Sequence, residues 1–283
     1  MNKADKYCKS IISDILKNGA VDKNPRPIWE DGTPAHSLSI NAVMEKYDLG
    51  RGEFPAITLR PVFYKNAIKE LFWIYVEQSN DLKLLREKYG INWWDDWALE
   101  NDTIGACYGY TVRKHNLMNN LLESIEKDPD SRRHIINLWQ EDDFKKPHGL
   151  KPCCYQVQFN VVNIDDKVKR LDMTLYQRSS DFIVAGYINS VQYAVLQCMV
   201  AHHFGMRPGI FTHFRQNVQI YLRHYDAAIE LLTRESIPYE AYVIINSDKK
   251  NFFDLTPEDI TIKGYPMEKI KEINPNIKLP VAI

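Results

Sequence analysis

The chain has 283 residues, of which 45% are hydrophobic and 26% are charged, a balance typical of folded globular proteins and unlike that of disordered or collagen-like chains. Lys and Arg together number 36 and Asp and Glu 37, so the net charge of −1 disfavours a bulk polyanion such as duplex DNA as a partner. No stretch approaches the ~18 consecutive apolar residues of a membrane-spanning helix, and no signal peptide is recognisable. We therefore expect a cytoplasmic protein that contacts neither membranes nor DNA.

The cysteines are odd in number, which excludes a fully paired disulfide scaffold: they are Cys8, Cys107, Cys153, Cys154 and Cys198. A reducing compartment fits this count. In such a compartment a cysteine serves packing, metal binding or nucleophilic catalysis.

The first half of the chain is predicted to be mainly helical. Residues 4–18 place apolar side chains on one helical face, and Gly19 follows as a stop signal. Residues 25–40 are rich in turn formers. Residues 64–78 are predicted to form a largely buried helix, and residues 114–127 an amphipathic one.

The second half of the chain mixes strands and helices. After a turn at 128–133, we expect strands at 134–139, 155–162 and 170–177, a central helix at 190–204 and, beyond a β-rich segment, a helix at 223–234. No repeat, linker or low-complexity run is visible, and no βαβ unit recurs. The pattern therefore predicts an α+β fold with a single domain over residues 1–283.

Cys153 is a candidate nucleophile. It stands in the segment KPCCYQ, directly after Pro152 and at the start of a predicted strand, where a ligand can reach a thiol. Burial of Cys153 and Cys154 as small apolar side chains is the commoner fate of free cysteines and remains the alternative. Zinc binding is disfavoured, because His148 has no second Cys or His pair at zinc-finger spacing.

Several charged side chains could serve a phosphate group or a proton. Arg26, Arg132, Arg133 and Arg178 can each bind phosphate through a forked guanidinium, although a surface arginine is most often simply solvated. Glu70 stands inside an otherwise apolar helical stretch. It therefore either faces solvent or is buried as a general acid or base.

Two further features admit both a structural and a ligand-binding interpretation. Asn189 precedes the helix predicted at 190–204, so capping that helix is the better explanation and binding a planar ligand through its amide the alternative. Trp93, Trp94 and Trp97 are more typical of a core or an interface than of a ligand wall.

Ten segments, spread over nearly the whole chain, bring these residues into one pattern: FPAITLR (54–60), KELFWIY (69–75), WDDWALEN (94–101), YG (108–109), DPDSRRHI (128–135), KPCCYQVQF (151–159), LYQRSSDF (175–182), Asn189, IYLRH (220–224) and KLPVAI (278–283). In this order they resemble the thymidylate synthase family of the folate-dependent type. The resemblance implies a twisted, mostly antiparallel to mixed sheet packed on helices, with a homodimer formed through the sheet face.

The resemblance also implies the reductive methylation of dUMP to dTMP, with 5,10-methylenetetrahydrofolate as the donor of one carbon and of hydride. Cys153 matches the nucleophile that adds to C6 of uracil, and Arg178 the cation that favours its thiolate. Asn189 matches the amide that accepts from uracil N3–H and donates to O4. Glu70 and Tyr108 match the groups that manage protons during the reaction.

The other matched positions bind the two substrates. Those expected at the nucleotide are Arg26, Arg132, Arg133, Arg178, Ser179, Ser180, Asp181, Asn189, Gln219 and Tyr221, with Arg132 and Arg133 reaching the phosphate in the partner subunit's site. Those expected at the folate are Trp94, Asp181, Ala185, Ala282 and Ile283. The resemblance implies no metal and no flavin.

Four positions depart from the family pattern. Cys154 stands where many members have His, Ala185 replaces a glycine at the folate contact, Gln219 replaces the sugar-binding His, and Phe63 falls where some members have a folate-contacting His. These changes leave a dUMP hydroxymethylase, in which water quenches the exocyclic methylene, as the alternative. A non-catalytic relative that binds nucleotides or RNA, including its own messenger RNA, is a third interpretation. Asn189 argues against a deoxycytidylate enzyme.

Overall fold

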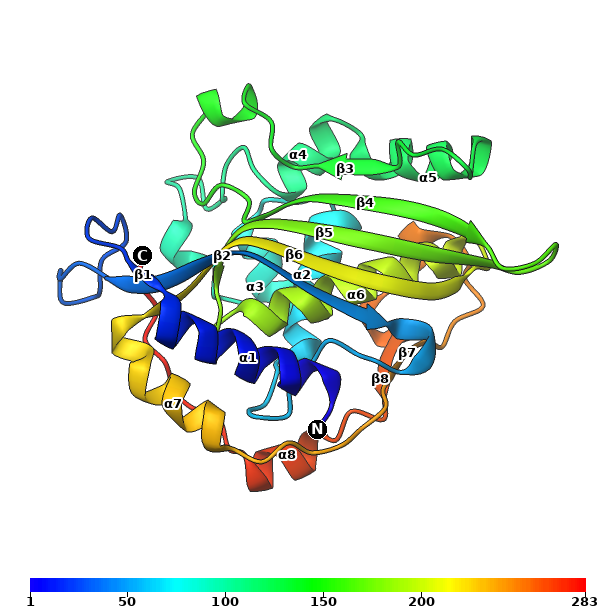
Figure 1. Ribbon diagram of the computed structural model, residues 1–283. Helices are drawn as coiled ribbons and strands as arrows, with labels where there is room; N and C mark the ends of the chain where they lie inside the picture. Colours follow the sequence, from blue (N-terminus) through cyan, green and yellow to red (C-terminus); the bar gives the residue numbers. More distant parts are fainter.

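The computed structural model describes residues 1–283. Its centre is a six-stranded twisted sheet with the strand order β1-β2-β6-β5-β4-β3 (Figure 1). The strands are β1 (Ala20–Val21), β2 (Ser37–Asp48), β3 (Ile135–Asn137), β4 (Cys154–Asn163), β5 (Lys169–Asp181) and β6 (Arg207–Tyr221). β5 and β6 run parallel, and every other neighbouring pair is antiparallel.

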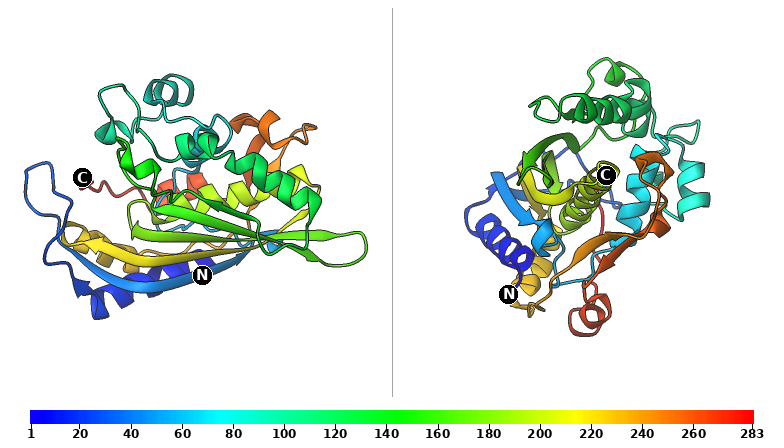
Figure 2. Two further views of the ribbon diagram at one scale, coloured as in Figure 1. Left: turned by 90° about the horizontal axis from the view of Figure 1, so that it is seen from above. Right: turned by 90° about the vertical axis from the view of Figure 1, so that its right-hand side faces the viewer.

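The helices pack around this sheet, as two further views show (Figure 2). They are α1 (Lys3–Asn18), α2 (Tyr64–Tyr75), α3 (Leu82–Tyr89), α4 (Gly109–Lys114), α5 (Leu117–Lys127), α6 (Gly186–His203), α7 (Tyr225–Thr233) and α8 (Met267–Ile273). A small antiparallel sheet pairs β7 (Tyr242–Ile245) with β8 (Ile260–Lys263). None of the helices combines the length and the apolar character that crossing a bilayer requires.

Helix α6 organises the fold. Parallel neighbouring strands need a long crossover between them, and α6 supplies it between β5 and β6. It lies along the sheet and packs against α2 as well, so every residue from Ser190 to Ala201 is buried (Figure 1). A helix enclosed on all sides is apolar around its whole circumference, which explains the density of apolar residues in this segment.

Alternation along the strands decides which face of the sheet is buried. On β5 the side chains of Leu171, Met173 and Leu175 are buried, whereas Thr174 and Tyr176 on the other face are half-buried. The buried side chains belong to one cluster of 64 hydrophobic residues that joins the sheet to α1, α2 and α6. The predicted α+β class is therefore confirmed.

Most predicted elements exist, with shifted ends. The helix expected at 64–78 ends at Tyr75, and the strand expected at 134–139 is limited to β3. The helix expected at 114–127 begins only at Leu117, as α5, because Asn116 adopts a left-handed conformation with φ of 53° and separates it from α4.

Strand β2 was not predicted, although it lies inside the sheet, between β1 and β6. Its sequence does not alternate cleanly, and its pairing with β6 is interrupted at Ala42, which has φ of 60°. Only its first residues overlap the segment at 25–40 that was expected to consist of turns. The strand owes its place to its neighbours in the sheet more than to its own pattern.

The predicted role of Asn189 as the cap of the helix at 190–204 is wrong. Helix α6 begins earlier, at Gly186, with Ala185 at its N-cap position. The amide nitrogen of Asn189 donates to the carbonyl oxygen of Ala185 (3.0 Å), as in a first helical turn. The side chain of Asn189 is therefore free of a capping duty and available for another purpose.

Candidate active site

Cys153 lies immediately before β4, which is an inner strand of the sheet. Its side chain is half-buried, its amide nitrogen donates to the hydroxyl of Tyr108 (3.2 Å), and its carbonyl oxygen accepts from the amide of Arg178 (2.9 Å). Cys154 begins the strand itself and is buried, with its thiol pKa raised well above the ordinary value by burial. The two neighbouring thiols therefore differ in accessibility and in ease of ionisation.

Two arginines act on the thiol of Cys153. Burial raises the pKa of Cys153, while the charges of Arg178 and then Arg26 lower it and so favour the thiolate. Arg178 is held by its own donors, because its Nε bonds the carbonyl oxygen of Pro152 (2.9 Å) and its Nη2 that of Lys151 (2.8 Å). Arg26 is exposed on the loop between β1 and β2.

Glu70 is buried in α2 and does not face solvent. One carboxylate oxygen accepts from the indole nitrogens of Trp93 (2.9 Å) and Trp94, and the other from Nε2 of Gln192 on α6 (2.6 Å). Burial raises the pKa of Glu70, and the three donors partly offset that rise. A carboxylate held so firmly is suited to orienting a proton or a water molecule.

Tyr108 connects Cys153 to the tryptophan side of the site. Its ring packs edge-on against Trp94 at a centroid distance of 5.0 Å, and burial raises the pKa of its hydroxyl well above 10. Its backbone is strained, with φ of 48° and ψ of −116°. The next residue must be Gly109, because a Cβ there would lie 2.0 Å from the carbonyl oxygen of Ser79.

A group of amides lies where β5, β6 and α6 meet. Nε2 of Gln177 donates to Oδ1 of Asn189 (3.2 Å) and to the carbonyl oxygen of Ser179 (2.9 Å). The hydroxyl of Ser179 donates to Oε1 of Gln219 (3.2 Å). The structure thus brings together the expected positions Asn189, Ser179 and Gln219, with Gln177 as a shared partner.

The end of β5 presents polar atoms without partners. The Ser180 hydroxyl and Oδ1 of Asp181 are enclosed and accept or donate no hydrogen bond. Burial raises the pKa of Asp181 to about 7, although the amide of Val184 and the charge of Arg60 oppose the rise. Enclosed polar atoms of this kind are unfavourable unless a ligand satisfies them. Ala185, at the N-cap of α6, is nearby in sequence and half-buried.

The C-terminal segment folds back onto the loop that carries Arg26. The amide of Ile283 donates to the carbonyl oxygen of Ile28 (3.0 Å), and the amide of Ile28 donates to that of Ile283 (2.8 Å). Ala282 packs on the small buried cluster that contains Trp29 and Tyr221. Burial raises the pKa of Tyr221, and Asp181, Arg26 and Cys153 also shift it, so Tyr221 lies near these expected site residues.

Two expected residues, and one position at which the chain departs from the family pattern, lie apart from this group. Arg132 and Arg133 are exposed between α5 and β3 and form no ion pair within the chain. Phe63 is 47% exposed at the N-cap position of α2.

Sequence reasoning missed several side chains that hold the site together: Trp29, Arg60, Gln177, Gln192 and His213. Gln177 directly precedes Arg178 in the segment LYQRSSDF. Because neighbouring side chains of a strand point to opposite faces, Gln177 lies on the inner face of the sheet and Arg178 on the other. The bond from Gln192 to Glu70 spans 122 positions along the chain. No local pattern announces such a contact.

Metal-binding clusters are absent: no three His, Cys, Asp or Glu side chains gather closely enough to hold an ion.

The comparisons with known proteins agree with one another. The family model for thymidylate synthase matches residues 5–283. The thymidylate synthase of Lactococcus lactis subsp. lactis is 43% identical over 284 residues, and that of Streptococcus mutans 42% identical over 285 residues, each covering 100% of both chains. The solved structure of thermostable thymidylate synthase A from Bacillus subtilis superposes with a TM-score of 0.88 at 32% identity, covering 99% of each chain. The chain therefore belongs to the thymidylate synthase family.

Proposed function

We propose that the chain methylates dUMP to dTMP by using Cys153 as the nucleophile that adds to C6 of the uracil ring. Methylation of dUMP to dTMP is the reaction of the family to which the chain belongs. The observation that carries the residue assignment is the half-buried thiol of Cys153, whose pKa is raised by burial and brought partly back down by the charges of Arg178 and Arg26. Cys154, fully buried one residue away, lacks that access.

The same arginines suit the phosphate of the nucleotide. A guanidinium binds a phosphate dianion through two parallel hydrogen bonds, and Ser179 offers a hydroxyl beside Arg178. The phosphate therefore binds at the same cluster of positive charge that favours loss of the thiol proton. In this proposal Arg178 binds the phosphate and also keeps residues 151–153 in place through its bonds to two carbonyl oxygens.

Asn189 is proposed to recognise the uracil edge and stabilise the enolate that forms after thiolate addition. Addition at C6 moves electron density to O4, where a hydrogen-bond donor lowers the barrier. Nδ2 of Asn189 can donate to O4, and its Oδ1 has a second lone pair for N3–H beyond the one used by Gln177. Gln219 and Tyr221 are proposed to contact the sugar.

Glu70 and Tyr108 are proposed to handle the proton lost from C5. Both are buried, and Trp94 links them by a hydrogen bond to Glu70 and a ring contact to Tyr108. Burial raises the pKa of Glu70, which makes its carboxylate a stronger base for that proton, and raises the pKa of Tyr108, which keeps its hydroxyl protonated as a hydrogen-bond donor.

The end of β5 fits the folate cosubstrate. A pterin ring carries N–H donors, and Oδ1 of Asp181 is an enclosed acceptor that has no donor in the chain. Trp94 and Ala185 offer apolar contacts, and the tail at Ala282 and Ile283 excludes water from that side. When bound, 5,10-methylenetetrahydrofolate supplies the one-carbon unit and the hydride.

A second copy of the chain is proposed to cover the outer face of the sheet. Met44 is 52% exposed there, and the rings of Tyr176 and Phe214 pack together at 6.1 Å while half-buried. An isologous dimer would cover this face and could carry the exposed Arg132 and Arg133 to the partner's phosphate site.

We also propose one catalytic domain, since a single core cluster joins sheet and helices, and a cytoplasmic location, since all five cysteines are free.

Product identification tests the proposed reaction. The protein is incubated with dUMP and 5,10-methylenetetrahydrofolate, and the nucleotide and folate products are separated. We expect dTMP with dihydrofolate. Hydroxymethyl-dUMP with tetrahydrofolate would instead establish the hydroxymethylase, and nucleotide binding without turnover would establish a binding protein; the family assignment favours neither of these alternatives.

A further inference from the structure

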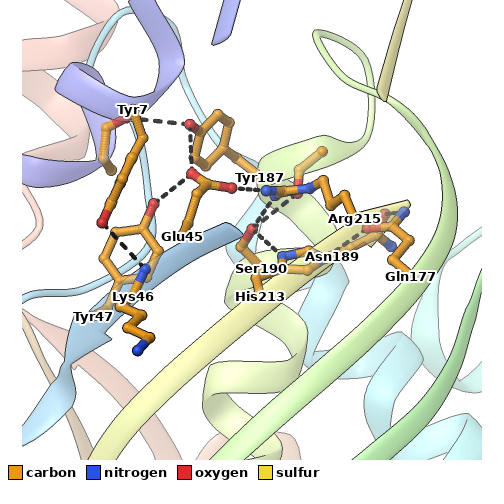
Figure 3. A network of polar contacts seen from close by, with 12 residues as sticks. Tyr7, Glu45, Lys46, Tyr47, Gln177, Tyr187, Asn189, Ser190, His213 and Arg215 are labelled. Atoms are coloured by element: carbon orange, nitrogen blue, oxygen red, sulfur yellow. Dashed lines mark hydrogen bonds and ion pairs between the residues drawn. The ribbon is translucent and has the colours of Figure 1, made fainter. Parts of the chain in front are cut away.

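A buried ion pair stands at one end of a continuous polar chain that leads to Asn189 (Figure 3). Glu45 on β2 pairs with Arg215 on β6, and neither side chain is exposed at all. Nη2 of Arg215 donates to the hydroxyl oxygen of Ser190 (2.8 Å). The chain continues from Ser190 Oγ to His213 Nδ1 (3.0 Å) and from His213 Nε2 to Gln177 Oε1 (2.7 Å).

The last step connects this chain to the proposed nucleotide site. Nε2 of Gln177 donates to Oδ1 of Asn189 (3.2 Å). Strand register explains the assembly, because Arg215 is paired with Gln177 on β5, and His213 is paired with Glu45 on β2. Inward-facing side chains of three adjacent strands thus meet the first turn of α6.

The two ends of the chain fix the direction of every hydrogen bond in it. Arg215 can only donate, and the carbonyl oxygen of Ser179 can only accept. Nε2 of Gln177 must therefore face Ser179 and Asn189, which leaves Oε1 toward His213. That oxygen needs a donor, so His213 carries its proton on Nε2 and presents Nδ1 as an acceptor.

The remaining members are consistent with that direction. Burial lowers the pKa of His213 to about 3, so the ring is neutral and has one proton to place. Ser190 then donates to Nδ1 and accepts from Arg215. The carbonyl oxygen of Gly186 is a second possible acceptor for the Ser190 hydroxyl. Because that oxygen already accepts from Nη2 of Arg215 (3.1 Å), it does not need the proton of Ser190.

We propose that Arg215, Ser190, His213 and Gln177 form a directional relay that locks the amide of Asn189 in the orientation that selects uracil. These four are positioning residues, and the inference rests on the proposed function of Asn189. In the locked state Oδ1 points to Gln177 and Nδ2 is presented to O4 of the base. Cytosine offers an amino group at C4 and an acceptor at N3, so it needs the opposite orientation. The flipped amide would set Nδ2 against Nε2 of Gln177, donor against donor.

Glu45 supports the relay without contacting its later members. It neutralises Arg215 and accepts from the hydroxyls of Tyr47 (2.8 Å) and Tyr187 (3.0 Å), so the guanidinium is held in place and charged within the core. The selectivity of the nucleotide site thereby depends on a charge pair that lies outside it.

Four variants test the relay, and calorimetry measures the equilibrium binding of dUMP and of dCMP to each of them. Ser190→Ala and His213→Met interrupt it, whereas His213→Gln retains an N–H donor toward Gln177 and serves as the matched control. The double variant Glu45→Gln, Arg215→Met removes the anchor and leaves no unpaired buried charge. Circular dichroism and thermal unfolding establish that each variant is folded.

We expect the wild type to bind dUMP more tightly than dCMP. The ratio of the dCMP to the dUMP dissociation constant should fall about tenfold in Ser190→Ala, His213→Met and the double variant, and should stay within about twofold of wild type in His213→Gln. An unchanged ratio in folded Ser190→Ala and His213→Met, or parallel weakening of both nucleotides, overturns the relay. A wild type that binds neither nucleotide refutes the proposed function instead.

Discussion

The ion pair between Glu45 and Arg215 yields a prediction about stability that needs no substrate. Both side chains are completely buried, and burial lowers the pKa of Arg215 to about 9, so the guanidinium is charged at neutral pH and needs a counter-charge in the core. Arg215→Met removes the cation and leaves a carboxylate in the core with two tyrosine hydroxyls as its remaining partners, Tyr47 and Tyr187. Breaking a buried pair from one side costs about 3–5 kcal/mol.

That free energy corresponds to a fall of about 6–20 °C in the unfolding midpoint for a chain of this size. Adding Glu45→Gln removes the orphaned charge while keeping an acceptor for the tyrosines, so the double variant should be more stable than either single variant. Arg223→Met, which breaks the exposed pair of Arg223 with Asp31, is the control and should leave the midpoint unchanged.

Thermal and urea unfolding at neutral pH measure all four variants and the wild type. An Arg215→Met variant that unfolds within about 1 kcal/mol of the wild type, or a double variant less stable than both single variants, would refute the stabilising role of this ion pair.

Three other predictions concern the site itself. Gly109→Ala should destabilise the protein by about 3 kcal/mol or more, because its Cβ would meet the Ser79 carbonyl oxygen at 2.0 Å; urea unfolding measures this, and a neutral result would contradict the close approach. The pKa of Asp181 is raised from 3.8 to about 7, so its contribution to stability is full at acid pH and is lost as the pH rises toward 7. The free energy of unfolding of Asp181→Asn, measured by urea unfolding, should therefore rise relative to that of the wild type between pH 4 and 7, by on the order of 3 kcal/mol. A difference that does not change over this pH range would contradict the raised pKa of Asp181. Glu70→Gln should lower the rate of dTMP formation while dUMP binding changes little; equal loss of both would show that Glu70 acts only in binding.

Much of the site could be predicted because its residues stand in short, contiguous segments. Cys153 at the start of a strand and Arg178 with Ser179 at the end of another are visible locally, whereas the tail at Ala282 was implied only by the resemblance to the family. Their convergence follows from strand pairing, since residue 154 lies opposite residue 177 in the sheet. For Glu70 the sequence favoured neither burial nor exposure. The structure shows that Glu70 is buried, where it contacts Gln192 on α6.

The rest depends on contacts between distant parts of the chain. Arg215 and Glu45 are ordinary charged residues in sequence, and only the register of β2 on β6 joins them in the core. Strand β2 itself lacks a clean alternation, so its place between β1 and β6 was not predictable. The start of α6 was misplaced for a related reason: tertiary packing of Gly186 and Tyr187 extends the helix beyond its apolar stretch.

The most direct test of the account compares two neighbouring thiols. Initial rates of dTMP formation from dUMP and 5,10-methylenetetrahydrofolate are measured for the wild type, Cys153→Ser and Cys154→Ser, with thermal unfolding as the check on folding. We expect Cys153→Ser to abolish turnover and Cys154→Ser to retain it, because Cys153 is half-buried beside Arg178 and Arg26 whereas Cys154 is buried. Turnover by Cys153→Ser together with an inactive but folded Cys154→Ser would contradict it.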